Sequence, residues 1–383
     1  MNVPRLRFPA FSDEWAHEKL GNICGFSQGI QVDLELQINE AKEGYVKFLR
    51  IENYTQNSFD FRFIPIELSS NKYITSKEIV VVRYGATAGY ISRGFDGVLA
   101  NNLFRIHPET KILDNDFLFE YLKREQVFKY FQTVMFGGAM PALSFSIVRS
   151  LELHYPRQLP EQTKIANFLT AIDEKITQFT QKCDLLAQYK KGVMQQIFSQ
   201  KLRFKDDDGR EFPEWEETAL GDIAHIKTGS KDLIDKEDEG IYPFFVRAQK
   251  IERINSYSYD GEAILIPGDG VNVGKVYHYV NGRFDYHQRV YKISDYKNAE
   301  AKYIFFYMNQ YFDKHAMSFN SKASVDSLRL PIIQKFKIQL PTKLEQTKIA
   351  NFLTAIDDKI TQAQTQLEAV KRYKKGLLQQ LFV

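Results

Sequence analysis

Apolar residues recur three and four positions apart along two long stretches of this chain, residues 161–198 and 345–382. In the first stretch they are Ile165, Leu169, Ile172, Ile176, Phe179, Cys183, Leu186, Val193 and Ile197. In the second they are Ile349, Leu353, Ile356, Ile360, Ala363, Leu367, Val370, Leu377 and Leu381. A 3.5-residue period over several heptads is typical of a coiled-coil seam, whereas an ordinary surface helix is about 11–12 residues long. We therefore predict two long helices that pack through these positions.

The two stretches are also copies of each other. At a constant offset of 184 residues, 24 of their 38 positions are identical, and residues 161–173 recur unchanged as residues 345–357. The remaining segments are related more distantly, and Gly29 pairs with Gly229 at an offset of 200. A repeat of this length indicates internal duplication. We expect two globular halves with the same order of elements, each followed by one long helix.

The segment between the helices predicts their direction. Each stretch of 38 residues would form a helix about 57 Å long. A parallel pair would require this segment to span that length, whereas an antiparallel pair lets it fold as a compact domain with neighbouring ends. We therefore predict an α+β protein in which two antiparallel coiled-coil helices separate two mixed domains, as a dumbbell with approximate two-fold symmetry.

Runs of β-branched and aromatic residues predict the elements of the two domains. Strands are expected at residues 45–51, 78–84, 90–92 and 103–106, and at 242–246, 263–266 and 276–280. The glycine-rich residues 268–275 are expected to form a hairpin turn, because Asp-Gly steps are typical of such turns. Aromatic amphipathic helices are predicted at residues 116–131 and 301–312. The expected divisions are a domain at 1–157, a helix at 158–200, a domain at 201–341 and a helix at 342–383.

Composition and charge narrow the function only slightly. The net charge of +3 is too small to indicate a polyanionic partner by itself. The two cysteines, Cys24 and Cys183, form no motif, and residues 1–20 show no signal-peptide pattern. No apolar run reaches the 18 residues of a candidate membrane span. These features predict a reduced, cytoplasmic protein without a membrane-spanning segment.

The sequence lacks the motifs of the enzymes that it superficially resembles. Gly270 and Gly274 are separated by three residues rather than the four of a phosphate-binding loop, and Val276 follows Lys275 where a serine or threonine would hold magnesium. There is no Asn-Pro-Pro-aromatic or Asp-Pro-Pro-aromatic tetrapeptide of an amino-methyltransferase, and no dinucleotide-binding glycine motif. The seven histidines are scattered, which argues against a metal site. We predict a chain without a catalytic centre.

Polar residues near the predicted glycine loops suit DNA binding better. Arginine can donate two hydrogen bonds to guanine, asparagine and glutamine can pair with adenine, and lysine can contact phosphate. The candidates in the first half are Arg50, Asn53, Arg83, Tyr84, Thr87, Asn101 and Asn102. Those in the second half are Arg247, Gln249, Lys250, Asn272, Lys275, His287, Gln288 and Arg289.

Three motifs that occur twice resemble a known family. They are Leu-Gly-x-Ile after a tryptophan, Glu-Gln-x-x-Ile-Ala-x-Phe-Leu at the start of each long helix, and Tyr-Lys-Lys-Gly followed by Gln-Gln-(Ile/Leu)-Phe at its end. In these motifs the chain resembles the specificity (S) subunits of type I restriction–modification systems. The resemblance covers essentially the whole chain.

This resemblance implies a DNA-recognition subunit. Each target-recognition domain would recognise one half of a bipartite site in double-stranded DNA. The helices would set the spacing and dock two methyltransferase (M) subunits, with Ile165, Leu169, Ile172, Ile176, Ile349, Leu353, Ile356 and Ile360 as helix-packing or partner-contacting residues. The M subunits would carry S-adenosylmethionine and methylate adenine N6. Motor–nuclease (R) subunits, which use ATP and magnesium, would join for restriction, and this chain would hold no cofactor itself.

Two other functions remain open from the sequence. One is a self-contained enzyme, such as a nuclease fused to its recognition domains. The other is a coiled-coil adaptor that binds only proteins. Activity of the purified chain without partners would favour the first, and salt-dependent DNA binding by the assembled complex would argue against the second.

Overall fold

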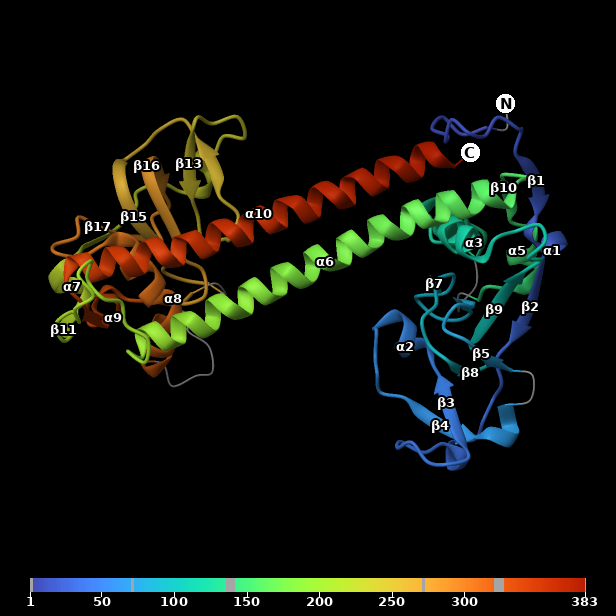
Figure 1. Cartoon of the computed structure of the whole chain (residues 1–383). Helices are drawn as coiled ribbons and strands as arrows, with labels where there is room; N and C mark the ends of the chain where they lie inside the picture. Colours follow the sequence, from blue (N-terminus) through green and yellow to red (C-terminus); the bar gives the residue numbers. More distant parts are fainter. Residues whose placement is uncertain (1–2, 70–71, 136–141, 271–272, 320–326, 383) are drawn as a thin grey trace. The chain divides into compact units, whose positions relative to one another are not determined.

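The computed structural model describes residues 3–69, 72–135, 142–270, 273–319 and 327–382 (Figure 1). The chain divides into two compact units: unit 1 comprises Met1–Phe179 and Gln366–Val383, and unit 2 comprises Thr180–Thr365. The long helices α6 (Leu159–Phe198) and α10 (Lys343–Leu381) each contribute to both units. Each unit therefore contains a mixed domain, the start of one long helix and the end of the other.

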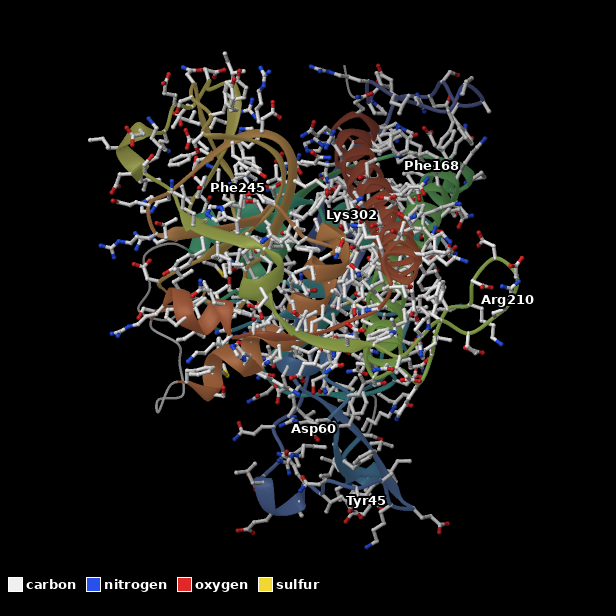
Figure 2. The ribbon with its side chains drawn as sticks, turned by 90° about the vertical axis from the view of Figure 1, so that its left-hand side faces the viewer. Tyr45, Asp60, Phe168, Arg210, Phe245 and Lys302 are labelled. Atoms are coloured by element: carbon white, nitrogen blue, oxygen red, sulfur yellow. The ribbon has the colours of Figure 1, made fainter. Side chains whose placement is uncertain are left out.

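Unit 1 contains a four-stranded sheet with the order β2-β9-β6-β7 and another with the order β4-β3-β8-β5. The first is antiparallel, the second pairs β3 and β8 in parallel, and β1 pairs with β10. Tyr45 and Asp60 mark the lobe of β3 and β4 (Figure 2). The strands are β1 (Ala16–Lys19), β2 (Cys24–Gln28), β3 (Tyr45–Leu49), β4 (Arg62–Pro65), β5 (Tyr73–Ile74), β6 (Ile79–Val82), β7 (Ile91–Ser92), β8 (Gly97–Leu99), β9 (Leu103–Pro108) and β10 (Glu152–Tyr155). The helices are α1 (Leu20–Ile23), η1 (Leu34–Leu36), α2 (Ile51–Thr55), η2 (Ile66–Ser69), α3 (Asn115–Leu122), α4 (Glu125–Met135) and α5 (Phe145–Ser150).

Unit 2 repeats this order with fewer and longer elements. Its main sheet has the order β12-β17-β15-β16-β13-β14, in which β13 and β16 are parallel, and β11 pairs with β18. The strands are β11 (Glu216–Ala219), β12 (His225–Thr228), β13 (Tyr242–Phe245), β14 (Glu252–Ile254), β15 (Tyr259–Pro267), β16 (His278–Tyr286), β17 (Val290–Ser294) and β18 (Lys337–Leu340). The helices are α7 (Leu220–Ile223), η3 (Leu233–Asp235), α8 (Ala301–Ser318) and α9 (Leu330–Gln334). Leu265 of β15 pairs with His278 of β16, so these consecutive strands form an antiparallel hairpin. Residues 271–272 of the turn predicted at 268–275 lie outside the described residues.

The single helix predicted at residues 116–131 is wrong. The segment forms two helices, because α3 ends at Leu122 and α4 begins at Glu125. Arg124 lies buried at the break, where its Nε donates to the backbone oxygen of Tyr121 at 3.2 Å. Its guanidinium also lies 4.7 Å from the ring centre of Phe382. The break between the two helices therefore coincides with a buried arginine that contacts both Tyr121 and Phe382.

The predicted seam positions face the interior of the units. Every one of them is buried or half-buried. Ile165, Leu169 and Ile172 share a hydrophobic core with Leu377 and Leu381 in unit 1. The corresponding core of unit 2 combines the first part of α10 with the last part of α6: Ile349, Leu353, Ile356, Val193 and Ile197. The half-buried Ile176 and Ile360 pack against these cores of units 1 and 2, respectively.

Contacts within each unit show that the long helices are antiparallel, as predicted. In unit 1, Lys374 near the end of α10 donates to Asp173 in the first half of α6 at 2.6 Å. In unit 2, Lys190 near the end of α6 lies 2.6 Å from Asp357 in the first half of α10. Lys190 and Lys374 interrupt the apolar pattern at matching positions. Each forms an ion pair with the matching aspartate of the other helix.

A buried glutamate fastens the start of each long helix to its domain. In unit 1, Glu161 accepts hydrogen bonds from Nε and Nη2 of Arg7 at 2.7 and 2.8 Å. In unit 2, Glu345 accepts from the same two atoms of Arg203 at 3.2 and 2.9 Å and from Nε1 of Trp215 at 3.1 Å. The two glutamates are 1% and 0% exposed, so these hydrogen bonds replace the water that an exposed carboxylate would bind.

The glutamine that follows each glutamate joins three chain segments. Gln162 accepts from the backbone nitrogen of Asp114 at 2.7 Å and donates to the carbonyls of Ile112 and Pro156 at 2.9 and 2.7 Å. Gln346 repeats the arrangement with Glu300, Asn298 and Pro341. A single amide thus satisfies three backbone groups, all of them buried or partly buried. This use explains chemically why both copies carry the Glu-Gln pair.

Candidate nucleic-acid interface

Polar residues predicted to contact DNA gather at one end of the sheets of unit 1. β3 and β8 end side by side there, since Leu49 pairs with Leu99 and accepts a hydrogen bond from Ala100 N at 2.9 Å. The end of β6 reaches the same place, because Arg83 N donates to Asn102 O at 2.9 Å. We call this end the unit 1 edge. Its predicted residues are Arg50, Arg83, Tyr84, Thr87, Asn101 and Asn102.

The side chains at the unit 1 edge are half-buried, and some of them contact a neighbouring side chain. The Arg83 guanidinium lies 4.8 Å from the ring centre of Tyr84. Nδ2 of Asn101 donates to Oε1 of Gln31 at 3.1 Å. Oδ1 of Asn102 is buried and has no hydrogen-bond partner among the described residues. An unsatisfied buried acceptor is costly, which fits a position that completes its bonding with a ligand.

The side chain of Asn53 is turned inward and is not available for contact with DNA. Its side chain is fully buried. Its oxygen accepts from Arg50 N at 2.7 Å, and its nitrogen donates to the carbonyls of Ser58 and Asp60 at 2.9 and 3.3 Å. Asn53 therefore caps α2 and holds the following loop. Arg50 contacts the same loop through Asp60 O at 3.2 Å and pairs with Glu52 at 2.9 Å.

Unit 2 builds an equivalent edge from equivalent backbone bonds. Gly268 N donates to Arg289 O at 2.7 Å, as Arg83 N does to Asn102 O in unit 1. Asp269 forms an isolated bridge with Ser327, as Tyr84 does with Ala142. Ile293 pairs with β12 and β15 in the way that Ile106 pairs with β2 and β6. The matched positions are therefore Arg83 with Gly268, Tyr84 with Asp269, Asn101 with Gln288, and Asn102 with Arg289.

Two aspartates hold the predicted side chains of this unit 2 edge. Asp269 accepts from Nη1 of Arg247 at 3.0 Å and from Nη1 of Arg289 at 2.6 Å. Asp232 accepts from the Gln288 amide and lies 3.6 Å from Nε2 of His287. Arg247, Gln288 and Arg289 are exposed, whereas His287 is 4% exposed.

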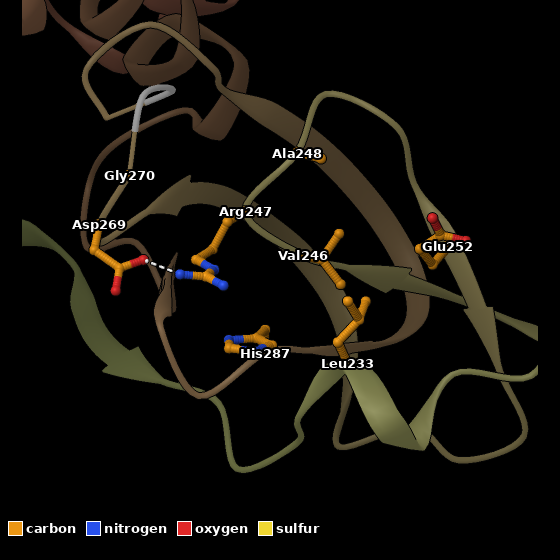
Figure 3. Close-up of a pocket in the computed structure, with 8 residues that line it drawn as sticks. All are labelled: Leu233, Val246, Arg247, Ala248, Glu252, Asp269, Gly270 and His287. Atoms are coloured by element: carbon orange, nitrogen blue, oxygen red, sulfur yellow. Dashed lines mark hydrogen bonds and ion pairs between the residues drawn. The ribbon is translucent and has the colours of Figure 1, made fainter.

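Part of the unit 2 edge borders a hollow. Arg247 reaches across it toward Asp269, and the cavity has a volume of about 310 Å³ (Figure 3). The residues around it are Leu233, Val246, Arg247, Ala248, Glu252, Asp269, Gly270 and His287. Of the other predicted residues, Gln249 and Lys250 follow on an exposed segment, Lys275 is exposed in the β15–β16 connection, and Asn272 lies outside the described residues.

The repeated glycine makes close backbone approach possible at both edges. A Cβ atom on Gly29 would lie 2.1 Å from the oxygen of Ala100, and one on Gly229 would lie 2.0 Å from the oxygen of Tyr286. Neither position can accept a side chain without movement of the backbone. The two glycines bring the segment after β2 or β12 against the edge, and this segment carries Gln31 in unit 1 and Asp232 in unit 2.

Sequence reasoning missed Gln31, Asp232 and Asp269. Gln31 lies two residues after Gly29, and Asp232 lies three residues after Gly229. The repeated glycine was therefore the one feature of the sequence that indicated a close approach of this segment to the edge. Asp269 lay within the predicted hairpin turn, where an aspartate is common for local reasons. The contacts of its two carboxylate oxygens with Arg247 and Arg289 depend on tertiary structure, which the sequence does not show.

The profile of the type I restriction modification DNA specificity domain matches residues 12–186 and 213–372. This chain belongs to that family. Among its relatives is the type I restriction enzyme MjaVIII specificity subunit of Methanocaldococcus jannaschii, with 25% identity over 97% of this chain and 92% of the relative. The EcoDI specificity subunit of Escherichia coli is 27% identical over 43% of this chain and 37% of its own length. The chain is therefore a type I restriction–modification specificity subunit with DNA-binding domains.

Solved structures support the fold of this specificity subunit. The S subunit of a type I system from M. genitalium superposes with a TM-score of 0.70 at 16% identity, over 100% of this chain and 99% of that chain. A structure described for complex assembly and conformational transition of the type I R-M system gives a TM-score of 0.54 at 17% identity, over 96% and 97%. Both confirm two mixed domains separated by long helices.

The described part of the specificity subunit contains no group of three or more histidine, cysteine, aspartate or glutamate residues placed to hold a metal ion. Among the described residues, none of the helices combines the length and the apolar composition of a membrane span. The eight predicted helix-packing residues are buried or half-buried within the units. Leu185 and Tyr189, one turn apart on α6, are 64% and 53% exposed. Phe168 of α6 packs against Phe8, and Phe352 of α10 packs against Phe204.

Proposed function

We propose that each unit of this specificity subunit recognises one half of an asymmetric, bipartite DNA site. The observation that carries this proposal is a common backbone framework with different side chains at matched positions. Tyr84, Asn101 and Asn102 in unit 1 correspond to Asp269, Gln288 and Arg289 in unit 2. Bases are distinguished by donor and acceptor patterns in the major groove, so unlike side chains on like frameworks favour unlike base sequences.

We further propose that the long helices set the gap between the half-sites and dock two M subunits. A continuous helix such as α6, with 40 residues, has a length of about 60 Å. This length corresponds to about 17 base pairs or fewer. The exposed Leu185 and Tyr189 supply apolar area for a partner, since exposed apolar stripes commonly mark protein-binding surfaces. Methyl transfer to adenine N6 and restriction belong to the M and R partners, and this chain has no catalytic role.

Exchange of one domain segment tests the two-domain proposal. Replacing residues 33–116 with the corresponding region of a relative should change one half-site only, because this segment carries the candidates of the unit 1 edge. The matched exchange of residues 232–302 should change only the other half-site. The measurement is the methylated sequence motif in cells that also express the M partner. If either exchange alters both half-sites, recognition is not divided between the units.

A further inference from the structure

Asp269 lies beneath two arginines at the unit 2 edge. Its side chain is 20% exposed, whereas those of Arg247 and Arg289 are 48% and 61% exposed. Each arginine donates through Nη1 to a different oxygen of the carboxylate, at 3.0 Å from Arg247 and 2.6 Å from Arg289. Figure 3 shows the Arg247 guanidinium directed at Asp269. The carboxylate therefore fixes the inner side of both guanidinium groups.

The carboxylate of Asp269 stays ionised at neutral pH. Burial acts to raise the pKa of Asp269, but the hydrogen bonds and charges of Arg289 and Arg247 outweigh it, and the pKa lies below its usual value. The contact with each arginine is therefore charge-assisted, which makes it stronger than a neutral hydrogen bond. A hold of this kind restricts two otherwise flexible side chains.

Unit 1 places a different arginine-holding group at the matched position. Tyr84 corresponds to Asp269, and its ring lies 4.8 Å from the Arg83 guanidinium. Phe145 lies on the same guanidinium at 5.7 Å. One unit thus orients an arginine with aromatic rings, and the other orients two arginines with a carboxylate. The shared feature is an oriented guanidinium at the edge proposed to face DNA.

We propose that Asp269 is a positioning residue that presents Arg289, with Arg247 beside it, to a guanine in the half-site recognised by unit 2. This inference rests on the proposed function. Arginine recognises guanine by donating to O6 and N7 together. A free arginine side chain loses rotamer entropy when it is fixed, so orientation before binding reduces that loss. Asp269 accepts a hydrogen bond from Nη1 of Arg289. A guanidinium has five N–H donors in all, so donors on its exposed side can reach the base.

Replacement of guanine by 7-deazaguanine tests this inference, because it removes only the N7 acceptor. The complex of this chain with its M partner is bound to duplexes that carry its methylated site, and each guanine is replaced in turn. The segment exchange described above identifies the half-site of unit 2. For the unaltered chain we expect affinity to fall on the order of tenfold to a hundredfold at one guanine of that half-site. Replacements in the other half-site should give penalties that do not depend on Asp269.

Two variants connect the penalty to the residues. In Asp269→Asn, which removes the charge that holds both arginines, the 7-deazaguanine penalty should fall several-fold at that guanine alone. Arg289→Met removes every donor of this side chain, so the same penalty should disappear. Because Arg289 is exposed, this second variant still tests the arginine–guanine contact on which the inference depends if Asp269→Asn does not fold.

Three results would overturn the inference while leaving the proposed function intact. They are a half-site of unit 2 without guanine, 7-deazaguanine penalties absent throughout that half-site, and penalties that remain unchanged in both variants. A general weakening that is equal in both half-sites would show that Asp269 acts on folding only, and would also overturn it. Failure of the proposed function has a different appearance, since the unaltered complex would then show no site-specific binding.

Discussion

Glu345→Ala should lower the free energy of unfolding by about 3–5 kcal/mol, because removing one member of a buried ion pair leaves its partner uncompensated. Glu345 is fully buried, and the partner left behind is Arg203, whose side chain is 15% exposed. Trp215 loses its acceptor in the same change. The measurement is urea or thermal unfolding of the chain followed by circular dichroism. The equivalent variant Glu161→Ala should show a similar loss in unit 1.

Glu368→Ala is the matched control for this prediction. Glu368 lies on the same helix, but it is 64% exposed and pairs only at the surface with Lys371 at 2.9 Å. An exposed pair of this kind contributes about 0–1 kcal/mol. If Glu345→Ala and Glu368→Ala lower the free energy of unfolding equally, the buried glutamate does not fasten helix α10 to its domain.

Insertion of one heptad into both long helices should lengthen the gap of the DNA site by about three base pairs and leave both half-sites unchanged. Seven helical residues add about 10 Å, and one base pair occupies about 3.4 Å. The insertions belong between Phe179 and Cys183 of α6 and between Ala363 and Leu367 of α10. These residues are outside the large hydrophobic cores of the units. A whole heptad preserves the apolar seam. Profiling of methylated adenines measures the result.

Insertion into α6 alone is the control for the gap prediction. It would shift the first helix relative to the second and separate partners such as Asp173 and Lys374 or Lys190 and Asp357. We expect methylation to be lost. If the double insertion instead leaves the gap unchanged, or if it changes the half-sites, the helices do not set the spacing.

The sequence predicted the long helices well because two independent patterns coincide in them. The 3.5-residue period identified positions such as Leu169 and Leu353, which are fully buried. The segment between the two copies is compatible with an antiparallel pair as one compact domain, and the ion pairs of Lys190 and Lys374 confirm this direction. Both patterns are local in sequence or repeated within it, so no knowledge of tertiary contacts was needed.

The polar edges were predicted less completely, since the direction of a loop side chain depends on tertiary contacts. Asn53 has the chemistry of an adenine contact but is turned inward by three backbone groups. Asp269 carries the charge that DNA repels, yet it lies under two arginines that face outward. At the break after Leu122, Arg124 is buried against Phe382 of the distant C-terminal segment, a contact that the local sequence pattern does not show. Residue type alone contains none of this information.

Profiling of methylated adenines in a genome that carries this chain and its M partner tests the central claim most directly. The account predicts one motif made of two short, different blocks of specified bases, separated by a gap of constant length without specified bases. A single contiguous motif, or two identical blocks in inverted orientation, would contradict two unlike recognition domains held apart by the paired helices.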